Sequence, residues 1–295
     1  MEITVSCMAC LLNKEEKRLR EQTDEKRKAR CFREIMGLLA AEGDAATAPY
    51  LVSRIREIYA KYFTQDDAFA PIKRHYNRLM LAREADFRRR IGESADPVRM
   101  ALCYARIANY IDFGANNQVT EEQLTELFAQ ADPLSVDGAE YRQFCSELER
   151  AGNFLLLADN CGEIVLDKLL METLQKHYPR LACTMMVRGG DVSNDVTLED
   201  AAEVGVEKVA RVISNGTRIG GTDVKHISSD ARRALEEADV ILAKGQGNFE
   251  TVYGGGYNVY YLFLCKCDHF TRRFGMEKFG GVFVNERRVA DAMVV

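Results

Sequence analysis

The chain has 295 residues, of which 47% are hydrophobic and 29% charged, a composition typical of globular proteins and unlike that of disordered chains. Its formal net charge of −5 argues against nucleic acids and anionic membranes as partners. The apolar runs are far shorter than the roughly 20 residues that cross a bilayer, and the N-terminus does not resemble a signal peptide. We therefore expect a soluble, cytoplasmic protein that binds neither membranes nor nucleic acid.

Residues 1–150 predict an all-helical N-terminal domain. This half of the chain is poor in glycine and holds four of the five prolines. Thr47 can cap a helix N-terminus, and Asp96 precedes a proline that suits a first helical turn. Thr120 and Gln123 have the spacing of a capping box. Apolar residues recur at helical spacing between these signals, so we expect six or seven helices.

Residues 151–295 predict an α/β domain, because short apolar runs alternate with helical patterns. The strand-like runs lie at residues 154–158, 182–187, 209–214, 240–243, 259–265 and 282–284. The helical patterns lie at residues 164–177, 198–204 and 230–237. Continuous apolar strands separated by helices are typical of a mostly parallel sheet with helices on both faces. The expected fold is a three-layer α/β/α domain that follows the helical domain.

Polar residues and glycines follow the predicted strands. Asp159, Asn160 and Glu163 come after the first strand, and Asp195 comes after the second. The fourth strand is followed by Lys244, Gly245, Gly247 and Asn248. Because ligands of an open parallel sheet gather at the carboxyl ends of its strands, these residues predict one functional site.

The residue types at these strand ends suit phosphoryl transfer. Asp159, Asp195 and the amide oxygen of Asn160 would form an oxygen-rich site for magnesium or manganese. Backbone N–H groups of the glycines and the charge of Lys244 would suit a phosphate. A simpler interpretation is that each Asp or Asn merely caps the next helix. The repetition at four strand ends favours a functional site, although Asp167 is better explained as a helix-dipole residue.

Two familiar phosphate-binding motifs are missing from the sequence. It contains no Gly-x-x-x-x-Gly-Lys-Ser/Thr, which disfavours a P-loop kinase. The stretch that begins at Gly245 lacks the third glycine of a dinucleotide fingerprint. Dinucleotide binding is therefore weakly supported.

Six blocks of the sequence together resemble the damage-control phosphatase family, also known as domain of unknown function 89. The blocks are CMAC at residues 7–10, IKRHYN at 72–77, ANYIDFG at 108–114, ADNCGEI at 158–164, RGG to NDVT at 188–197 and KGQGNFE at 244–250. The N-terminal blocks resemble the stand-alone microbial branch. The resemblance implies hydrolysis of a phosphorylated metabolite, activated by manganese, magnesium, cobalt or nickel. It also implies a helical N-terminal part packed on a three-layer α/β/α domain.

The same resemblance implies roles for individual residues. The metal ligands would be Asp159, Asn160 and Asp195, and Asp159 would also orient or activate the nucleophile. Lys244 would be catalytic by stabilising charge on the phosphoryl group. Substrate and phosphate binding would fall to Asn109, Asp112, Glu163, Gly245, Gly247 and Asn248. Asn109 and Asp112 are three residues apart, which predicts that they share one helix face.

Nine cysteines are scattered through a chain without an export signal, so we expect reduced thiols. For Cys7 and Cys10, buried helix packing is favoured over a redox or metal role.

Two rival functions are also compatible with the sequence. The first is a nucleotide-cofactor-dependent transferase, such as a methyltransferase, which would bind its cofactor without a divalent metal. The second is a non-catalytic protein that binds a phosphometabolite. The metabolite itself, for example a sugar phosphate or a phosphopantetheine-like compound, and the oligomeric state stay undetermined.

Overall fold

A six-stranded sheet forms the centre of the molecule in the computed structural model, which describes residues 1–43, 45–64, 69–112 and 120–289. The strands are β1 Asn153–Leu157, β2 Ala182–Val187, β3 Arg211–Ser214, β4 Val240–Lys244, β5 Val259–Leu264 and β6 Gly281–Asn285. Their spatial order is β3-β2-β1-β4-β5-β6, and all neighbours are parallel except β5 and β6. The order reverses between β1 and β4, where α/β sheets open a crevice for ligands.

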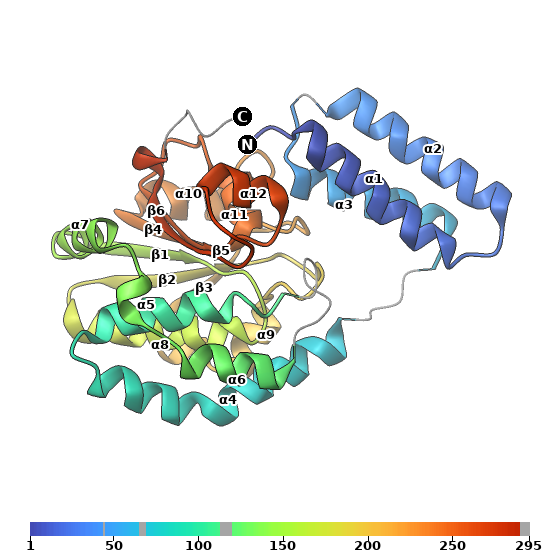
Figure 1. Ribbon diagram of the computed structural model, residues 1–295. Helices are drawn as coiled ribbons and strands as arrows, with labels where there is room; N and C mark the ends of the chain where they lie inside the picture. Colours follow the sequence, from blue (N-terminus) through green and yellow to red (C-terminus); the bar gives the residue numbers. More distant parts are fainter. Residues whose placement is uncertain (44, 65–68, 113–119, 290–295) are drawn as a thin grey trace.

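Helices cover both faces of the sheet, as Figure 1 shows. One face is covered by α10 Ser229–Glu237, α11 Gly245–Val252 and α12 Asp268–Phe274, whose apolar residues share a core with Leu157. The other face carries α4 Ala70–Glu93, α5 Pro97–Ala108, α6 Glu121–Ala129, α7 Gly138–Leu148, α8 Glu163–His177 and α9 Leu198–Val204, which share a core with Leu156. Adjacent residues of β1 thus enter opposite cores, because side chains alternate along a strand. The predicted α/β/α layering and mostly parallel sheet are confirmed.

The first three helices form a separate unit, which we call the helical lobe (residues 1–62). They are α1 Val5–Arg20, α2 Glu25–Glu42 and α3 Ala48–Tyr62. Their buried apolar residues, among them Leu11, Ile35 and Ile55, form a cluster of their own. From α4 onward the helices instead share a core with the sheet. The predicted boundary near residue 150 stays a prediction, but the core already becomes continuous with the sheet at α4.

Specific contacts join the helical lobe to the rest of the molecule. Thr47 Oγ1 donates to Asp223 Oδ2 at 2.9 Å, and Lys225 Nζ donates to the carbonyl of Ala45 at 2.9 Å. The ring of Tyr50 stacks on that of His226 with the centroids 4.4 Å apart. These contacts hold the N-terminal end of α3 against the loop that follows the carboxyl end of β3.

The predicted helix starts are confirmed at three caps. Thr47, Asp96 and Thr120 accept hydrogen bonds from the backbone N–H groups of Tyr50, Arg99 and Gln123. Seven α-helices precede β1 in the described residues, within the expected number. Short 3-10 turns occupy Pro133–Ser135, Val206–Lys208 and Glu286–Arg288. None of the described helices has the length and apolarity that a membrane crossing requires.

Candidate functional site

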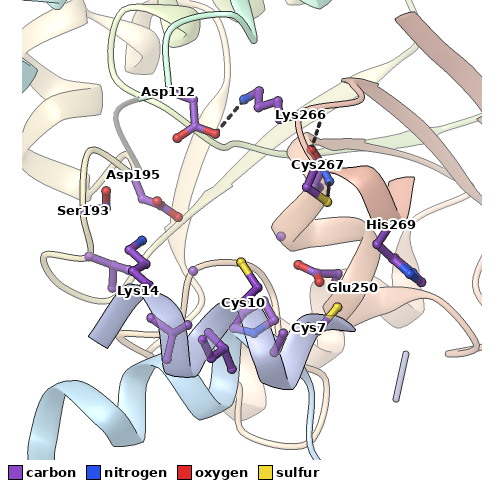
Figure 2. A pocket seen from close by; sticks show the side chains of 18 of the residues that line it. Cys7, Cys10, Lys14, Asp112, Ser193, Asp195, Glu250, Lys266, Cys267 and His269 are labelled. Atoms are coloured by element: carbon purple, nitrogen blue, oxygen red, sulfur yellow. Dashed lines mark hydrogen bonds and ion pairs between the residues drawn. The ribbon is translucent and has the colours of Figure 1, made fainter. Parts of the chain in front are cut away.

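A cavity of about 550 Å³ lies between the helical lobe and the carboxyl ends of the strands. Asp159 and Asn160 reach it from the end of β1, and Asp195 reaches it from the loop after β2. Lys266 follows β5 and lines the same cavity (Figure 2). Since β1 is the switch strand of the sheet, the cavity occupies the crevice that this topology opens.

The floor of the cavity is built by Asp159 and Asp195. The loops that carry them are joined by backbone hydrogen bonds, one of which runs from Val196 N to the Asp159 carbonyl at 2.9 Å. Asp159 Oδ2 accepts hydrogen bonds from Asn160 Nδ2 at 2.7 Å and Asn109 Nδ2 at 3.1 Å. The pairing of β1 with β2 therefore brings together two carboxylates that are 36 residues apart in the sequence, as the strand-end argument predicted.

Burial gives this floor unusual electrostatics. Burial raises the pKa of Asp159 well above its usual value, and the neighbouring Glu163 and Asp195 raise it further. Burial also raises the pKa of Asp195, although the Arg188 guanidinium, whose Nε donates to Asp195 Oδ2 at 2.7 Å, opposes this. Several carboxylates therefore share one poorly solvated region, where a cation would be strongly stabilised.

The donor atoms at this floor fit a hard divalent cation. Asn160 Nδ2 donates to Asp159 and to Glu163 Oε2, so the polar atom that remains on this amide is its oxygen. Together with Asp159 and Asp195 it makes an all-oxygen set, the kind that Mg²⁺ and Mn²⁺ prefer. Within the described residues, no three Asp, Glu, His or Cys side chains form a preassembled metal cluster. The fit therefore depends on two carboxylates and the amide.

Lys244 lies beneath the cavity floor and does not line the cavity. Its ammonium donates to Glu163 Oε1, to Asp167 Oδ1 at 2.7 Å and to the Ala105 carbonyl at 2.9 Å. These three bonds use all the N–H groups of a lysine. The prediction that Lys244 contacts phosphate directly therefore disagrees with its position. Asp167, interpreted from sequence as a helix-dipole residue, is instead a buried partner of this lysine.

Asn248 and Gly245, which were predicted to bind substrate beside Lys244, make contacts within the protein. Asn248 is buried, and its Nδ2 donates to the carbonyls of Lys244 and Ala158 at 2.7 and 3.0 Å. Gly245 has a φ of +77°, and a Cβ there would come within 1.9 Å of Asp159 Oδ2. Gly245 thus makes room for the Asp159 carboxylate. Gly247 lines the cavity, and its role in substrate binding stays a prediction.

Asn109 and Asp112 both reach the site, but they do not share a helix face. Helix α5 ends at Ala108, so the two residues lie in the turn that follows it. Asn109 is buried and donates to Asp159 and Glu163, whereas Asp112 lines the cavity and pairs with Lys266 at 2.7 Å. Glu163, predicted to bind substrate, is buried below the floor. Residues 113 and 114 of the 108–114 block lie outside the described residues.

Lys266 and Arg188 are site residues that the sequence interpretation did not assign. Lys266 follows the apolar run at residues 259–265, so the strand-end rule applied to a fifth strand would have found it. Arg188 follows β2 and is buried behind the floor, with Nη2 3.6 Å from Asp159 Oδ1. The positive charge of this buried arginine stabilises the negative charges of the carboxylates around it.

The nine cysteines are free thiols, as expected. The expectation that Cys7 and Cys10 are buried by helix packing is wrong. Cys10 is exposed, Cys7 is partly exposed, and both line the cavity from α1 (Figure 2).

Comparisons with known proteins identify the family of this chain. The family model described as damage-control phosphatase ARMT1-like domain matches residues 3–280. A damage-control phosphatase of Pyrococcus horikoshii is 30% identical over 94% of this chain and 96% of its own. A damage-control phosphatase of Archaeoglobus fulgidus is 28% identical over the same shares of the two chains.

A solved structure supports the same assignment. The crystal structure of a DUF89 family protein from P. horikoshii matches with a TM-score of 0.77 and 28% identity, covering 97% of this chain and 99% of that chain. The family resemblance expected from the six sequence blocks is thus confirmed. The chain belongs to the damage-control phosphatase ARMT1-like domain family.

Proposed function

We propose that this protein is a metal-dependent damage-control phosphatase that hydrolyses a phosphorylated small metabolite. The observation that carries the proposal is the pair of buried carboxylates, Asp159 and Asp195, which lie with Asn160 at one end of a cavity of metabolite size. The relatives named damage-control phosphatase support it. Family membership also favours a phosphatase over the transferase and the non-catalytic binding protein considered above.

In this proposal the protein holds a cation and a phosphoryl group at the cavity floor. Asp159, Asn160 and Asp195 would bind a divalent cation, which would polarise the phosphoryl oxygens and lower the pKa of a water molecule. Asn109 and Asn160 fix the Asp159 carboxylate by hydrogen bonds. Asp159 is therefore held in position to orient the attacking group, and Lys266 supplies a positive charge at the cavity surface.

Chelation tests the metal requirement. Treatment with EDTA should abolish phosphate release from phosphate esters, and manganese, magnesium, cobalt or nickel should restore it. Asp159→Asn and Asp195→Asn should each lower kcat/KM by about 10²- to 10³-fold, since each removes charge where the transition state needs it. Asp230→Asn, on the exposed side of α10, is the matched control and should behave like the wild type. Full turnover in demetallated protein would refute the proposal.

A further inference from the structure

Basic side chains form part of the cavity wall. Lys14 on α1, Arg56 on α3 and Arg218 in the loop after β3 all line it. Figure 2 shows Lys14 projecting from α1 into the pocket. A cavity of about 550 Å³ is much larger than a phosphoryl group requires, so a substrate that fills it also reaches this wall.

Arg56 and Arg218 are like charges that influence each other. Burial lowers the pKa of Arg56, and Arg18 and Arg218 lower it further, whereas Asp195 and Asp191 act in the opposite direction. Two guanidinium groups on one wall repel each other, and an anion bound between them would relieve that repulsion. Guanidinium groups also match the planar fork of a carboxylate or the oxygens of a phosphate.

The side chain of Arg218 packs over the turn after β2. A Cβ at Gly190 would lie 2.5 Å from Arg218 Nε and 3.0 Å from its Cγ, so the arginine packs directly over Gly190 and a larger residue there would push it aside. The adjacent Gly189 N–H donates to the carbonyl of Thr217 at 2.7 Å and to Asn215 Oδ1 at 3.1 Å. The backbone on both sides of the contact is thus tied together. Arg218 is seated at the cavity although its side chain is exposed.

We propose that the substrate is a phosphate ester with a second anionic group, a carboxylate or another phosphate, besides the phosphoryl group that is transferred. Arg56 and Arg218 bind that second group, and Lys14 adds a further positive charge to the same cavity. The neutral middle of the substrate then lies along Pro49 and Val52, which line the cavity from α3. The inference rests on the proposed phosphatase function and adds the class of its substrate.

Matched pairs of esters test this proposal. Glucose 6-phosphate and 6-phosphogluconate differ by a carboxylate at the far end, and fructose 6-phosphate and fructose 1,6-bisphosphate differ by a phosphate. The wild-type protein should favour the member with two anionic groups in at least one pair, by about tenfold or more in kcat/KM. The pair that shows the preference identifies the second group as carboxylate or phosphate.

Variants of Arg56 and Arg218 test whether these arginines cause the preference for esters with two anionic groups. Arg56→Gln and Arg218→Gln should each reduce the preference for the two-anion ester by about tenfold, mainly through KM, because the second anion is not the group that reacts. Gly190→Ala should reduce it while keeping both charges, since it displaces Arg218. Arg233→Gln, an exposed arginine of α10 outside the cavity, should leave both members of each pair unchanged.

Two outcomes would overturn the proposal. Equal losses for both members of a pair would mean that the arginines hold the transferred phosphoryl group itself. The absence of any wild-type preference would mean that the wall does not select a second anion. Calorimetry with the Asp159→Asn protein separates this inference from the proposed function. If no ester is hydrolysed with any metal, but binding still favours the two-anion ligand and depends on both arginines, the anion site stands and the phosphatase proposal fails.

Discussion

The cavity floor and the helical lobe face each other, but they are held in place in different ways. At the floor, charged side chains are buried and fixed by several partners, as Lys244 is by Glu163 and Asp167. In the lobe, an independent apolar core carries half-buried or exposed cations such as Arg56 and Lys14. Fixed groups suit the chemical step, which demands defined geometry, whereas outward-reaching cations suit selection among ligands.

The largest loss of stability should follow the replacement of Lys244, which lies beneath the cavity floor. Lys244→Met should lower the free energy of unfolding by about 3–5 kcal/mol, because it leaves Glu163 and Asp167 buried without their cation. Lys266→Met should cost less, since its partner Asp112 is partly exposed. Urea denaturation measures both variants.

A second variant keeps this prediction decisive if the first folds poorly. Adding Asp167→Asn to Lys244→Met removes one of the stranded charges and should recover part of the lost stability. If Lys244→Met is as stable as the wild type and loses only phosphate affinity, Lys244 contacts the substrate after all. The distinction between residues that line the cavity floor and residues buried beneath it would then fail.

A mutation in the core of the lobe should affect substrate selection more than the chemical step. Ile55 is 1% exposed, and Ile55→Ala should destabilise the lobe by about 2–5 kcal/mol. Hydrogen exchange should then show α1–α3 opening more readily than the sheet. Because Arg56 follows Ile55, the preference for two-anion esters should fall more than turnover of one-anion esters. Equal protection of lobe and sheet in the variant would show that the two regions form one cooperative unit.

The smallest effect should appear where the lobe meets the sheet. Burial raises the pKa of Glu250 to about 7 in the folded protein, from 4.5 for an unperturbed carboxyl. The folded state therefore binds a proton that the unfolded state releases, so this group contributes stability at low pH that is lost as the pH rises through about 7. Glu250→Gln should flatten the pH dependence between pH 5 and 8 by on the order of 1 kcal/mol. If the free energy of unfolding changes with pH in the same way for both proteins, the Glu250 carboxyl is solvated and its pKa is not raised.

Local sequence patterns determined most of the architecture. The runs at 182–187 and 198–204 match β2 and α9 residue for residue, and the other predicted elements begin or end within two residues of the observed ones. These segments are recognisable because central strands of a parallel sheet are apolar on both faces and helices have a 3.6-residue period. The antiparallel direction of β6 and the helix at Gly245–Val252 were not predicted, because both depend on what packs against them.

The sequence by itself also determined that Asp159, Asn160 and Asp195 meet, because parallel strands that are neighbours end at the same edge. Only the tertiary structure decided the roles of the remaining residues. Lys244 and Lys266 both follow apolar strands, yet one is enclosed by carboxylates and the other lines the cavity. A strand end specifies where a side chain starts, but whether it meets solvent or a buried acid depends on the helix packed above it. For Lys244 that helix is α8, which carries Glu163 and Asp167 and takes its place through long-range packing that no local pattern encodes.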